Sequence, residues 1–317
     1  SLKKKACNES SMMCFGEWQF NWAKVVKNPI DFEIYLMLNE CIICNSTQSK
    51  VLYEGILKCE ECGHVFSDIH LSDEELFNLY RRSYFFGDEY RDYFADRKVQ
   101  QKSFKLRMKV LQSFLDPNRH KHLLEIGCAY GFFLNMVKDK FDTVYGIDIT
   151  EDGIQYATEQ LKLDVVKADL IKHDFSDKKF DVVCMWDTIE HLRSPQLYLK
   201  KISEHMDCGS LIALTTGDID SLNARMKKDK WRLMHPPTHI HYFSKKTLAR
   251  MLNDNGFDII YNHYCSFYRS VDLLAYRILV LQRKWLWLYS LLFKSRFTRM
   301  DFYLNMYDIM YVIACKR

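Results

Sequence analysis

Short apolar runs alternate with amphipathic stretches from residue 119 to the end of the chain. The apolar runs predict buried strands, and stretches with apolar residues three and four positions apart predict helices. Strands that alternate with helices form a parallel sheet. The pattern therefore predicts an α/β, Rossmann-like fold. The predicted strands are Leu123–Ile126, Thr143–Ile147, Val165–Lys167, Asp181–Met185, Leu211–Leu214, Phe257–Tyr264 and Tyr307–Ala314, and the predicted helices are 132–139, Asp152–Leu161, Pro195–His205 and Lys245–Asn255.

A strand, a tight turn of small residues and a helix run from His122 to Phe132. The small residues of the turn, Gly127, Ala129 and Gly131, let a ligand approach the backbone closely. The helix N-terminus behind them accepts a carboxylate. A dinucleotide fingerprint requires glycine at i, i+2 and i+5, and the alanine and phenylalanine found at the last two positions exclude it.

The order Glu125-x-Gly127-x-Ala129-x-Gly131 instead resembles motif I of class I S-adenosylmethionine (SAM) methyltransferases, with alanine where glycine is usual. This resemblance implies that SAM is the cofactor and that all four residues belong to its site. The alternative is an ordinary strand, turn and helix without a ligand.

Polar and aromatic residues follow three of the other predicted strands. Ligands of open α/β sheets bind at the carboxyl ends of the strands. Asp148 is placed to accept hydrogen bonds from ribose hydroxyls, while Asp169 and Trp186 suit the adenine amino group and the methionine moiety of SAM. We expect these three residues, with Ile149 and Leu170, to complete the cofactor site.

Two downstream stretches carry a wider resemblance. Residues 181–192 are similar to motif IV of the ubiquinone-biosynthesis-like methyltransferases, and Pro236 to Ser244 resembles the downstream signature of the same group. Many members also begin with a four-Cys zinc ribbon and a Tyr-Phe segment, as this chain does at Tyr84. The resemblance implies a seven-stranded sheet whose last strand is antiparallel.

The same resemblance indicates a catalytic base. Deoxysugar C-methyltransferases of this group carry a histidine that matches His239, although Thr238 replaces their glutamate and their large C-terminal domain has no counterpart here. We therefore expect O-methylation of a sugar or glycan precursor. A hydroxyl acceptor must lose a proton, and histidine accepts one near neutral pH. We predict His239 as the base, with Glu190 and His191 also in the site, and a structural role for His241.

Two pairs of cysteines predict a zinc site. Cys41-x-x-Cys44 and Cys59-x-x-Cys62 each direct two thiolates at one point, and two such pairs close a tetrahedral Zn²⁺ site. Four cysteine ligands leave no open position, so the predicted role is structural. The alternatives are four unrelated cysteines, or His64 as a substitute ligand.

These features divide the chain into five parts. Residues 1–40 receive no assignment, 41–68 form the zinc ribbon, and 69–118 form a helical and aromatic cap. Most of its aromatic residues are expected to pack in a core, and the alternative is that Tyr93 or Tyr84 covers the cofactor. Residues 119–266 and 307–317 form the SAM-binding domain, which residues 267–306 interrupt.

The interrupting segment is rich in Leu and Trp with flanking Lys and Arg, notably Trp285 and Trp287 beside Arg283 and Lys284. We favour a helical lid or a dimer face. The alternative is a basic amphipathic helix that lies in a membrane interface. Apolar runs in the chain are shorter than the ~20 residues of a membrane-spanning helix.

The composition of the chain indicates which classes of binding partner to expect. The chain has 317 residues, 48% hydrophobic and 27% charged, with a net charge of +4 from interspersed Lys/Arg and Asp/Glu. Nucleic acid is therefore not the expected partner, and a small molecule is. Eleven cysteines with two CxxC pairs indicate a reducing compartment, so we expect a cytoplasmic location with membrane association as the alternative. Rival functions are an RNA base methyltransferase with a zinc module and a non-catalytic SAM-fold scaffold.

Overall fold

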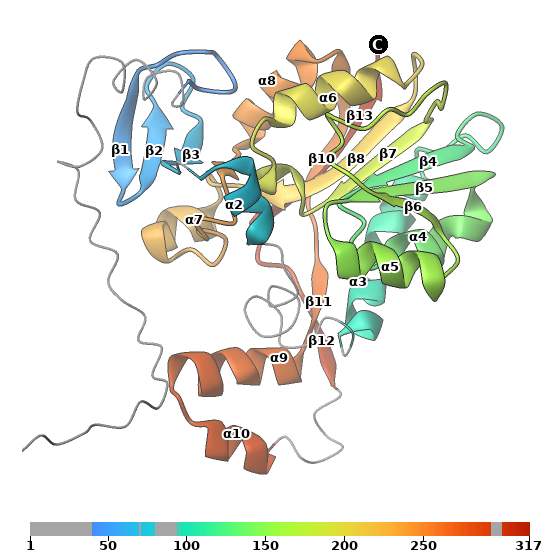
Figure 1. Ribbon diagram of the computed structural model, residues 1–317. Helices are drawn as coiled ribbons and strands as arrows, with labels where there is room; N and C mark the ends of the chain where they lie inside the picture. Colours follow the sequence, from blue (N-terminus) through green and yellow to red (C-terminus); the bar gives the residue numbers. More distant parts are fainter. Residues whose placement is uncertain (1–39, 70, 80–93, 95, 293–299) are drawn as a thin grey trace, which may run out of the picture. The chain divides into compact units, whose positions relative to one another are not determined.

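The computed structural model describes residues 40–69, 71–79, 94, 96–292 and 300–317. Within them, residues 40–317 form one compact unit built on a seven-stranded sheet (Figure 1). The strand order is β10–β13–β8–β7–β4–β5–β6. The strands are β4 (His122–Ile126), β5 (Thr143–Asp148), β6 (Asp164–Lys167), β7 (Val182–Trp186), β8 (Leu211–Gly217), β10 (Phe257–Tyr264) and β13 (Ile309–Lys316).

The last strand, β13, is antiparallel to both of its neighbours, β10 and β8, while β8, β7, β4, β5 and β6 run parallel. This confirms the predicted α/β fold, the seven strands and the antiparallel last strand. The predicted strand Phe257–Tyr264 is correct at both ends, and the others differ from the observed strands by one to three residues at an end.

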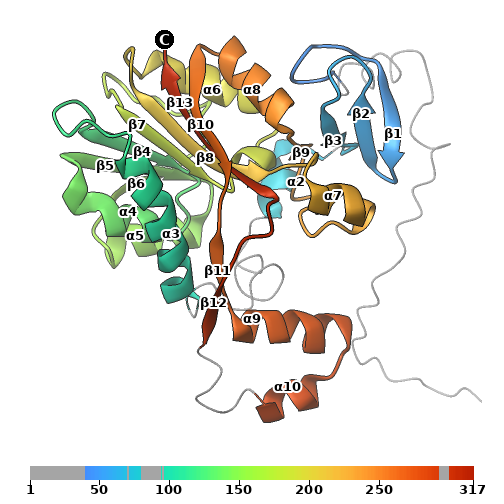
Figure 2. The ribbon, with the colours of Figure 1, turned by 180° about the vertical axis from the view of Figure 1, so that it is seen from behind.

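Helices cover the sheet on both faces (Figures 1 and 2). Successive side chains of a strand point to opposite faces, so each strand serves two cores. In β7, Val183 and Met185 join a core with α6 (Pro195–Glu204) and α8 (Lys245–Asp254). Val182 and Cys184 join the other core, which packs against α3 (Arg97–Gln112), α4 (Phe132–Val137) and α5 (Glu151–Glu159).

A second sheet contains the cysteine pairs. Its order is β1 (Ser49–Tyr53), β2 (Ile56–Cys59), β3 (Val65–Ser67) and β9 (His241–Tyr242). Strands β1 and β2 form an antiparallel hairpin between the two cysteine pairs. The fourth strand comes from the downstream signature, because Val65 pairs with Tyr242 and Phe66 with His241. The ribbon and the SAM-binding segment therefore share a sheet as well as a core.

Two shorter elements complete the description. Helix α2 (Asp73–Asn78) has the predicted capping box, in which the Ser72 hydroxyl accepts from the Glu75 N–H and the Glu75 carboxylate accepts from the Ser72 N–H. Helix α7 (Leu222–Lys227) begins at Ser221, whose hydroxyl accepts from the Ala224 N–H.

Residues 267–306 contain strands as well as the expected helices. Strands β11 (Phe267–Ser270) and β12 (Asp301–Leu304) form an antiparallel hairpin. It carries α9 (Val271–Ala275), a π-helix (Tyr276–Gln282) and α10 (Leu286–Leu292). In the part of the chain that the structure describes, no helix is long and apolar enough to cross a bilayer.

Candidate functional site

The turn after β4 is the first component of the site. Gly127, Ala129 and Gly131 all have positive φ, of 74°, 45° and 69°. A Cβ at position 127 would also collide with Thr188, because it would lie 2.6 Å from the Thr188 Oγ1 atom. Ala129 is the residue that breaks the glycine pattern. Positive φ is uncommon for alanine, and the Asp148 Oδ2 atom holds it by accepting from the Ala129 N–H at 2.7 Å.

A cavity of roughly 400 Å³ opens beside this turn at the carboxyl ends of β4, β5 and β7. Its size is within the range of ~300–1,000 Å³ that small-molecule and cofactor sites occupy. Six of the predicted cofactor residues line it, while Glu125, Gly131 and Leu170 lie outside its wall. The six are Gly127, Ala129, Asp148, Ile149, Asp169 and Trp186.

Asp148 connects the turn after β4 to the turn after β5. Besides the Ala129 N–H, its carboxylate accepts from the Thr150 N–H at 2.8 Å and from the Thr150 hydroxyl at 2.6 Å. Burial raises its pKa, and these bonds oppose the rise. A carboxylate has about four acceptor sites, so three protein bonds leave capacity for a hydroxyl in the cavity.

Asp169 lines the cavity at the next strand. Its Oδ1 accepts from the Tyr198 hydroxyl at 2.8 Å and from the Ile171 N–H at 3.1 Å. Glu125 lies behind the turn, where burial and the nearby Asp148 raise its pKa well above the usual range. Two half-buried carboxylates at neighbouring strand ends, beside exposed backbone of the turn, fit the ribose and adenine groups of SAM.

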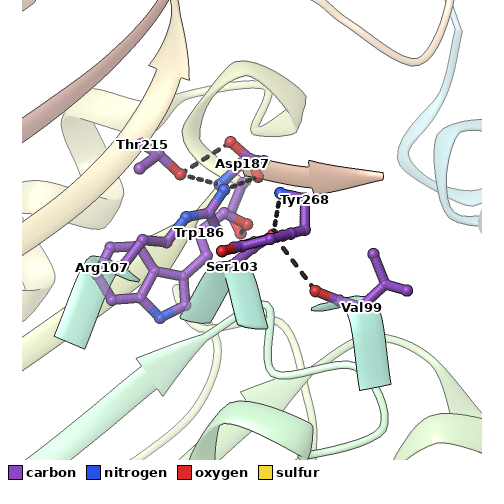
Figure 3. A network of polar contacts seen from close by, with 8 residues as sticks. Val99, Ser103, Arg107, Trp186, Asp187, Thr215 and Tyr268 are labelled. Atoms are coloured by element: carbon purple, nitrogen blue, oxygen red, sulfur yellow. Dashed lines mark hydrogen bonds and ion pairs between the residues drawn. The ribbon is translucent and has the colours of Figure 1, made fainter. Parts of the chain in front are cut away.

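Sequence reasoning missed an ion pair at the end of β7, between the buried Arg107 and the partly exposed Asp187 (Figure 3). The Arg107 Nη2 atom, on α3, lies 2.7 Å from the Asp187 Oδ2 atom. Thr215, on β8, donates its hydroxyl to Asp187 Oδ1 at 2.8 Å. Burial alone would raise the pKa of Asp187, but Arg107 and Thr215 outweigh it and lower the pKa. The Arg107 guanidinium also lies 5.4 Å from the Trp186 ring centroid, so this pair fixes one wall of the cavity.

The predicted catalytic residues lie close to one another, and one of them lines the cavity. Potential ligand atoms of Glu190, His191 and His239 all lie within 4.8 Å of one another. His191 Nδ1 bonds the Thr238 carbonyl at 2.8 Å, and His239 Nδ1 bonds the Leu233 carbonyl at 2.9 Å. Carbonyls only accept, so Nδ1 of each neutral ring carries the proton and Nε2 is the acceptor atom.

The two histidines differ in their access to the cavity. Their ring centroids are 4.6 Å apart, but only His191 belongs to the cavity wall. Burial, with His191 and His235 nearby, lowers the pKa of His239 well below its usual range. Burial and the neighbouring Asp187 raise the pKa of Glu190 to about 8. At pH 7, His239 is therefore a neutral, weak base, and the Glu190 carboxyl is mostly protonated.

His241 contacts the ribbon instead of the cavity. Its Nδ1 lies 3.2 Å from His64 Nε2, and its Nε2 lies 3.1 Å from the Arg193 carbonyl oxygen. Burial lowers its pKa to about 4. This arrangement agrees with the structural role expected for it.

The four cysteines of the ribbon form one cluster. Their sulfur atoms lie within 4.8 Å of one another, with Cys41 and Cys62 sulfurs 3.4 Å apart and Cys44 and Cys59 sulfurs 3.5 Å apart. Tetrahedral zinc at ~2.3 Å from each sulfur implies S···S distances of about 3.8 Å. Burial opposes ionisation of Cys59, but the Cys62 backbone and the Cys44 thiol outweigh it and lower its pKa to about 7. The donor set fits Zn²⁺.

The remaining residues to place are the predicted aromatic cover and the rest of the cavity wall. Tyr84 and Tyr93, the predicted aromatic cover, lie outside the described residues. Helix α2 supplies Leu76 and Phe77 to the cavity wall, which the sequence did not indicate. Further wall residues that were missed are Thr150, Ile171, Lys172, Thr188, Leu192, Arg193, Ser194, Leu197 and Tyr198.

Comparison with known proteins identifies the family. A family model described as a methyltransferase domain matches residues 91–262, more than half of the 317-residue chain. The chain is 36% identical over 93 residues to N-methyltransferase 4 of Papaver somniferum, with 26% of each chain covered. It is 26% identical over 153 residues to the ubiquinone biosynthesis O-methyltransferase of Rickettsia canadensis, covering 43% of this chain and 62% of that enzyme.

The chain thus spans 26% and 62% of the lengths of these two relatives. Among solved structures, it is similar to the magnesium protoporphyrin IX methyltransferase of Synechocystis PCC 6803 with bound S-adenosylhomocysteine. The TM-score is 0.47 at 17% identity, covering 76% of this chain and 94% of the other.

Proposed function

We propose that this chain, which belongs to the methyltransferase-domain family, transfers a methyl group from SAM to a small-molecule acceptor. One observation supports this most strongly. A single cavity is lined by the turn after β4, by the carboxylates of Asp148 and Asp169, and by His191. Cofactor groups and a proton acceptor therefore face the same space.

The residues divide the task of holding SAM. The turn at Gly127 and Ala129 gives backbone that a ligand can approach, Asp148 accepts from the ribose hydroxyls, and Asp169 accepts from the adenine amino group. Trp186 borders the sulfonium end, where Arg107 and Asp187 keep its ring in place. SAM supplies an electrophilic methyl group, so the main task of the protein is to align it with the acceptor.

We assign the proton transfer to His191 and a supporting role to His239. His191 lines the cavity, and its Nδ1–H is held by the Thr238 carbonyl, so Nε2 is the atom that accepts the acceptor's proton. His239 packs edge-on against it. A Glu190 carboxyl oxygen lies within 4.8 Å of a ring nitrogen of each histidine, so this acidic side chain borders the ring that takes the acceptor's proton. This differs from the expectation that His239 itself is the base.

The acceptor class rests on the sequence resemblance. A hydroxyl of a sugar, nucleotide sugar or glycan precursor needs the base that His191 supplies. A second candidate is an amine, because the relative from Papaver somniferum is named as an N-methyltransferase. We further propose that Cys41, Cys44, Cys59 and Cys62 bind one structural Zn²⁺, since their geometry and chemistry fit it.

Calorimetry with SAM and an S-adenosylhomocysteine release assay test these assignments together. Asp148→Ala should weaken SAM binding by a few kcal/mol, since charge-assisted hydrogen bonds contribute ~1.5–3 kcal/mol each. Asp139→Ala removes an exposed carboxylate from the turn after α4 and is the matched control. A correctly folded wild-type protein that does not bind SAM would leave the scaffold as the better interpretation.

The catalytic assignment needs an acceptor, so nucleotide sugars and then amines are screened first. His191→Ala should keep SAM affinity and lower kcat by ~10²–10⁴, the contribution of a positioned acid or base. His239→Ala should lose less. The reverse order of the two variants would restore His239 as the base.

A further inference from the structure

The helices carried by the β11–β12 hairpin expose large apolar side chains. Trp287 is 67% exposed and Leu291 is 68% exposed. Soluble proteins rarely expose contiguous apolar patches, and those that do use them for binding. We call this set the apolar tip; its members are Leu274, Ile278, Trp285, Leu286, Trp287 and Leu291.

The apolar tip lies on elements that stand away from the seven-stranded sheet. Both ribbon views show α9 and α10 beyond the hairpin, without a helix of the sheet beside them (Figures 1 and 2). Among the described side chains of the three helical elements, Leu273 and Tyr289 are the buried apolar ones, and the Tyr289 hydroxyl donates to Asp272 at 2.6 Å. The two helices therefore fix each other and leave the tip open.

The sequence of the segment that carries the tip is strongly basic. Residues 267–306 contain seven Lys and Arg against two Asp, a net charge of +5, whereas the whole chain carries +4. All other residues together therefore carry −1. The positive charge of this protein is concentrated in the segment that carries its exposed Trp and Leu side chains.

A second copy of the chain is a poor match for this surface. In a symmetric dimer the same patch faces itself, so two segments of +5 would be brought together. An anionic lipid surface meets both requirements. Indole rings prefer the membrane–water interface, and basic residues around an apolar face are attracted to anionic headgroups.

The attachment of the tip relates it to the cavity. β10 and β8 run in the same direction, because both are antiparallel to β13. The carboxyl end of β10, from which the hairpin leaves, is therefore at the edge of the sheet where the cavity opens. The Tyr268 N–H donates to Ser103 on α3 at 2.9 Å, one helical turn from Arg107 (Figure 3).

We propose that the apolar tip docks on an anionic lipid membrane, with its Trp and Leu side chains in the interface and Arg283 and Lys284 at the headgroups. Docking through this segment holds the cavity edge of the sheet near the lipid surface. Acceptors that reside in a membrane would then reach the cavity without leaving the membrane.

Vesicle sedimentation of the full chain tests the proposal. Wild-type protein should bind vesicles of phosphatidylcholine with about 30% phosphatidylglycerol, with binding that weakens as salt rises, and should not bind pure phosphatidylcholine. Trp285→Ser/Trp287→Ser should abolish binding. Arg283→Gln/Lys284→Gln should weaken it roughly thirty-fold, since each basic residue near the surface contributes about fivefold.

Leu222→Ser/Met226→Ser is the matched control, because these two residues of α7 are 74% and 72% exposed and lie outside the tip. It should bind as wild type does. Circular dichroism and thermal unfolding check that each variant is folded. Equal binding to neutral and anionic vesicles, no binding, or no effect of the Trp substitutions would overturn the proposal. A dimer in ultracentrifugation that the Trp substitutions dissociate would assign the tip to self-association instead.

Discussion

The protein adds two structures to its seven-stranded sheet, and they differ in how they are attached. The four-stranded sheet with the cysteines packs its Leu57 and Phe66 into the same core as Leu124 and Met185 of the large sheet. The hairpin with α9 and α10 instead exposes large apolar side chains, among them Trp287 and Leu291. An addition that shares a core supports the site, whereas an addition that exposes apolar surface supplies a surface for binding.

The ribbon reaches the site through direct hydrogen bonds. Ser67, on β3, donates its hydroxyl to the His239 carbonyl at 2.8 Å. His64 lies 3.2 Å from His241, which in turn bonds the Arg193 carbonyl in the cavity wall. The ribbon is thus hydrogen-bonded to the backbone of His239 and, through His64 and His241, to the backbone of Arg193, although its cysteines take no part in the chemistry.

The largest expected effect comes from opening the cysteine cluster. Cys59→Ser should reduce the zinc content from one ion per chain to none and destabilise the protein by several kcal/mol. Structural zinc supplies ~10–16 kcal/mol of apparent binding free energy in zinc-finger peptides, and binding is coupled to folding. Turnover should fall as well, because β9 loses its partner strand.

Elemental analysis and denaturant unfolding measure these effects. Cys208→Ser removes an exposed thiol outside the cluster and serves as the control. Full zinc content in Cys59→Ser, or no zinc in wild-type protein purified without chelator, contradicts the assignment. If loss of zinc left the unfolding midpoint unchanged, the ribbon would not differ from the hairpin in its contribution to stability.

The sequence anticipated the large sheet better than the ribbon. Long strands have a clear apolar pattern, and Phe257–Tyr264 was correct at both ends. β9 is only two residues long, too short for any period, so the sharing of a sheet between the ribbon and the downstream signature could not be predicted. The hairpin strands β11 and β12 could not be predicted, because the whole segment around them is apolar and shows no separate strand pattern.

In the site, too, some residues could be predicted from the sequence and others could not. The turn and the strand ends place the cofactor residues, because short spacing fixes their geometry. The pair of Arg107 and Asp187 joins residues 80 positions apart, and in the sequence Arg107 is one basic residue among several on a helix. A motif match selected His239, but only the fold shows that His191 forms the cavity wall.

An effect of intermediate size on the free energy of unfolding is expected when the pH is lowered. The pKa of His241 is lowered to about 4 in the folded protein from an ordinary value of 6.5. Between these values the unfolded chain binds a proton that the folded chain does not, so the free energy of unfolding falls as pH drops from 6.5 to 4. The full contribution is present above pH 6.5. The difference of the two pKa values corresponds to about 3 kcal/mol.

His241→Gln should flatten this dependence, which denaturant unfolding at pH 4.5, 5.5 and 7 measures. The variant loses stability at pH 7 through altered hydrogen bonds, so the slope is compared and not the absolute stability. His263→Gln, in which a histidine on β10 without the buried contacts of His241 is changed, is the control. A wild-type slope in His241→Gln assigns the acid sensitivity elsewhere, with the buried His64 as the next group to test.

The smallest effect is expected from removing the helices of the hairpin. Ser270 pairs with Asp301 across β11 and β12, so a two-residue turn can close the hairpin there. Replacing residues 271–300 by Asn-Gly, the preferred sequence for such a turn, removes the apolar tip and retains both strands. Among the described residues of the removed helices, the buried apolar side chains are Leu273 and Tyr289. The deletion removes both of them together with α9 and α10.

The shortened protein should therefore unfold within a few degrees of wild type, since ~1 kcal/mol shifts the midpoint by ~2–4 °C at this size. SAM affinity, and turnover of a water-soluble acceptor, should stay within about twofold, while binding to anionic vesicles should be lost. The three measurements separate the roles of the segment. A lid over the cofactor would show itself as weakened SAM binding, and a segment that shares the core would show itself as a large drop in midpoint. Either result would place the hairpin helices in the same class as the ribbon, because their removal would then affect the site or the core.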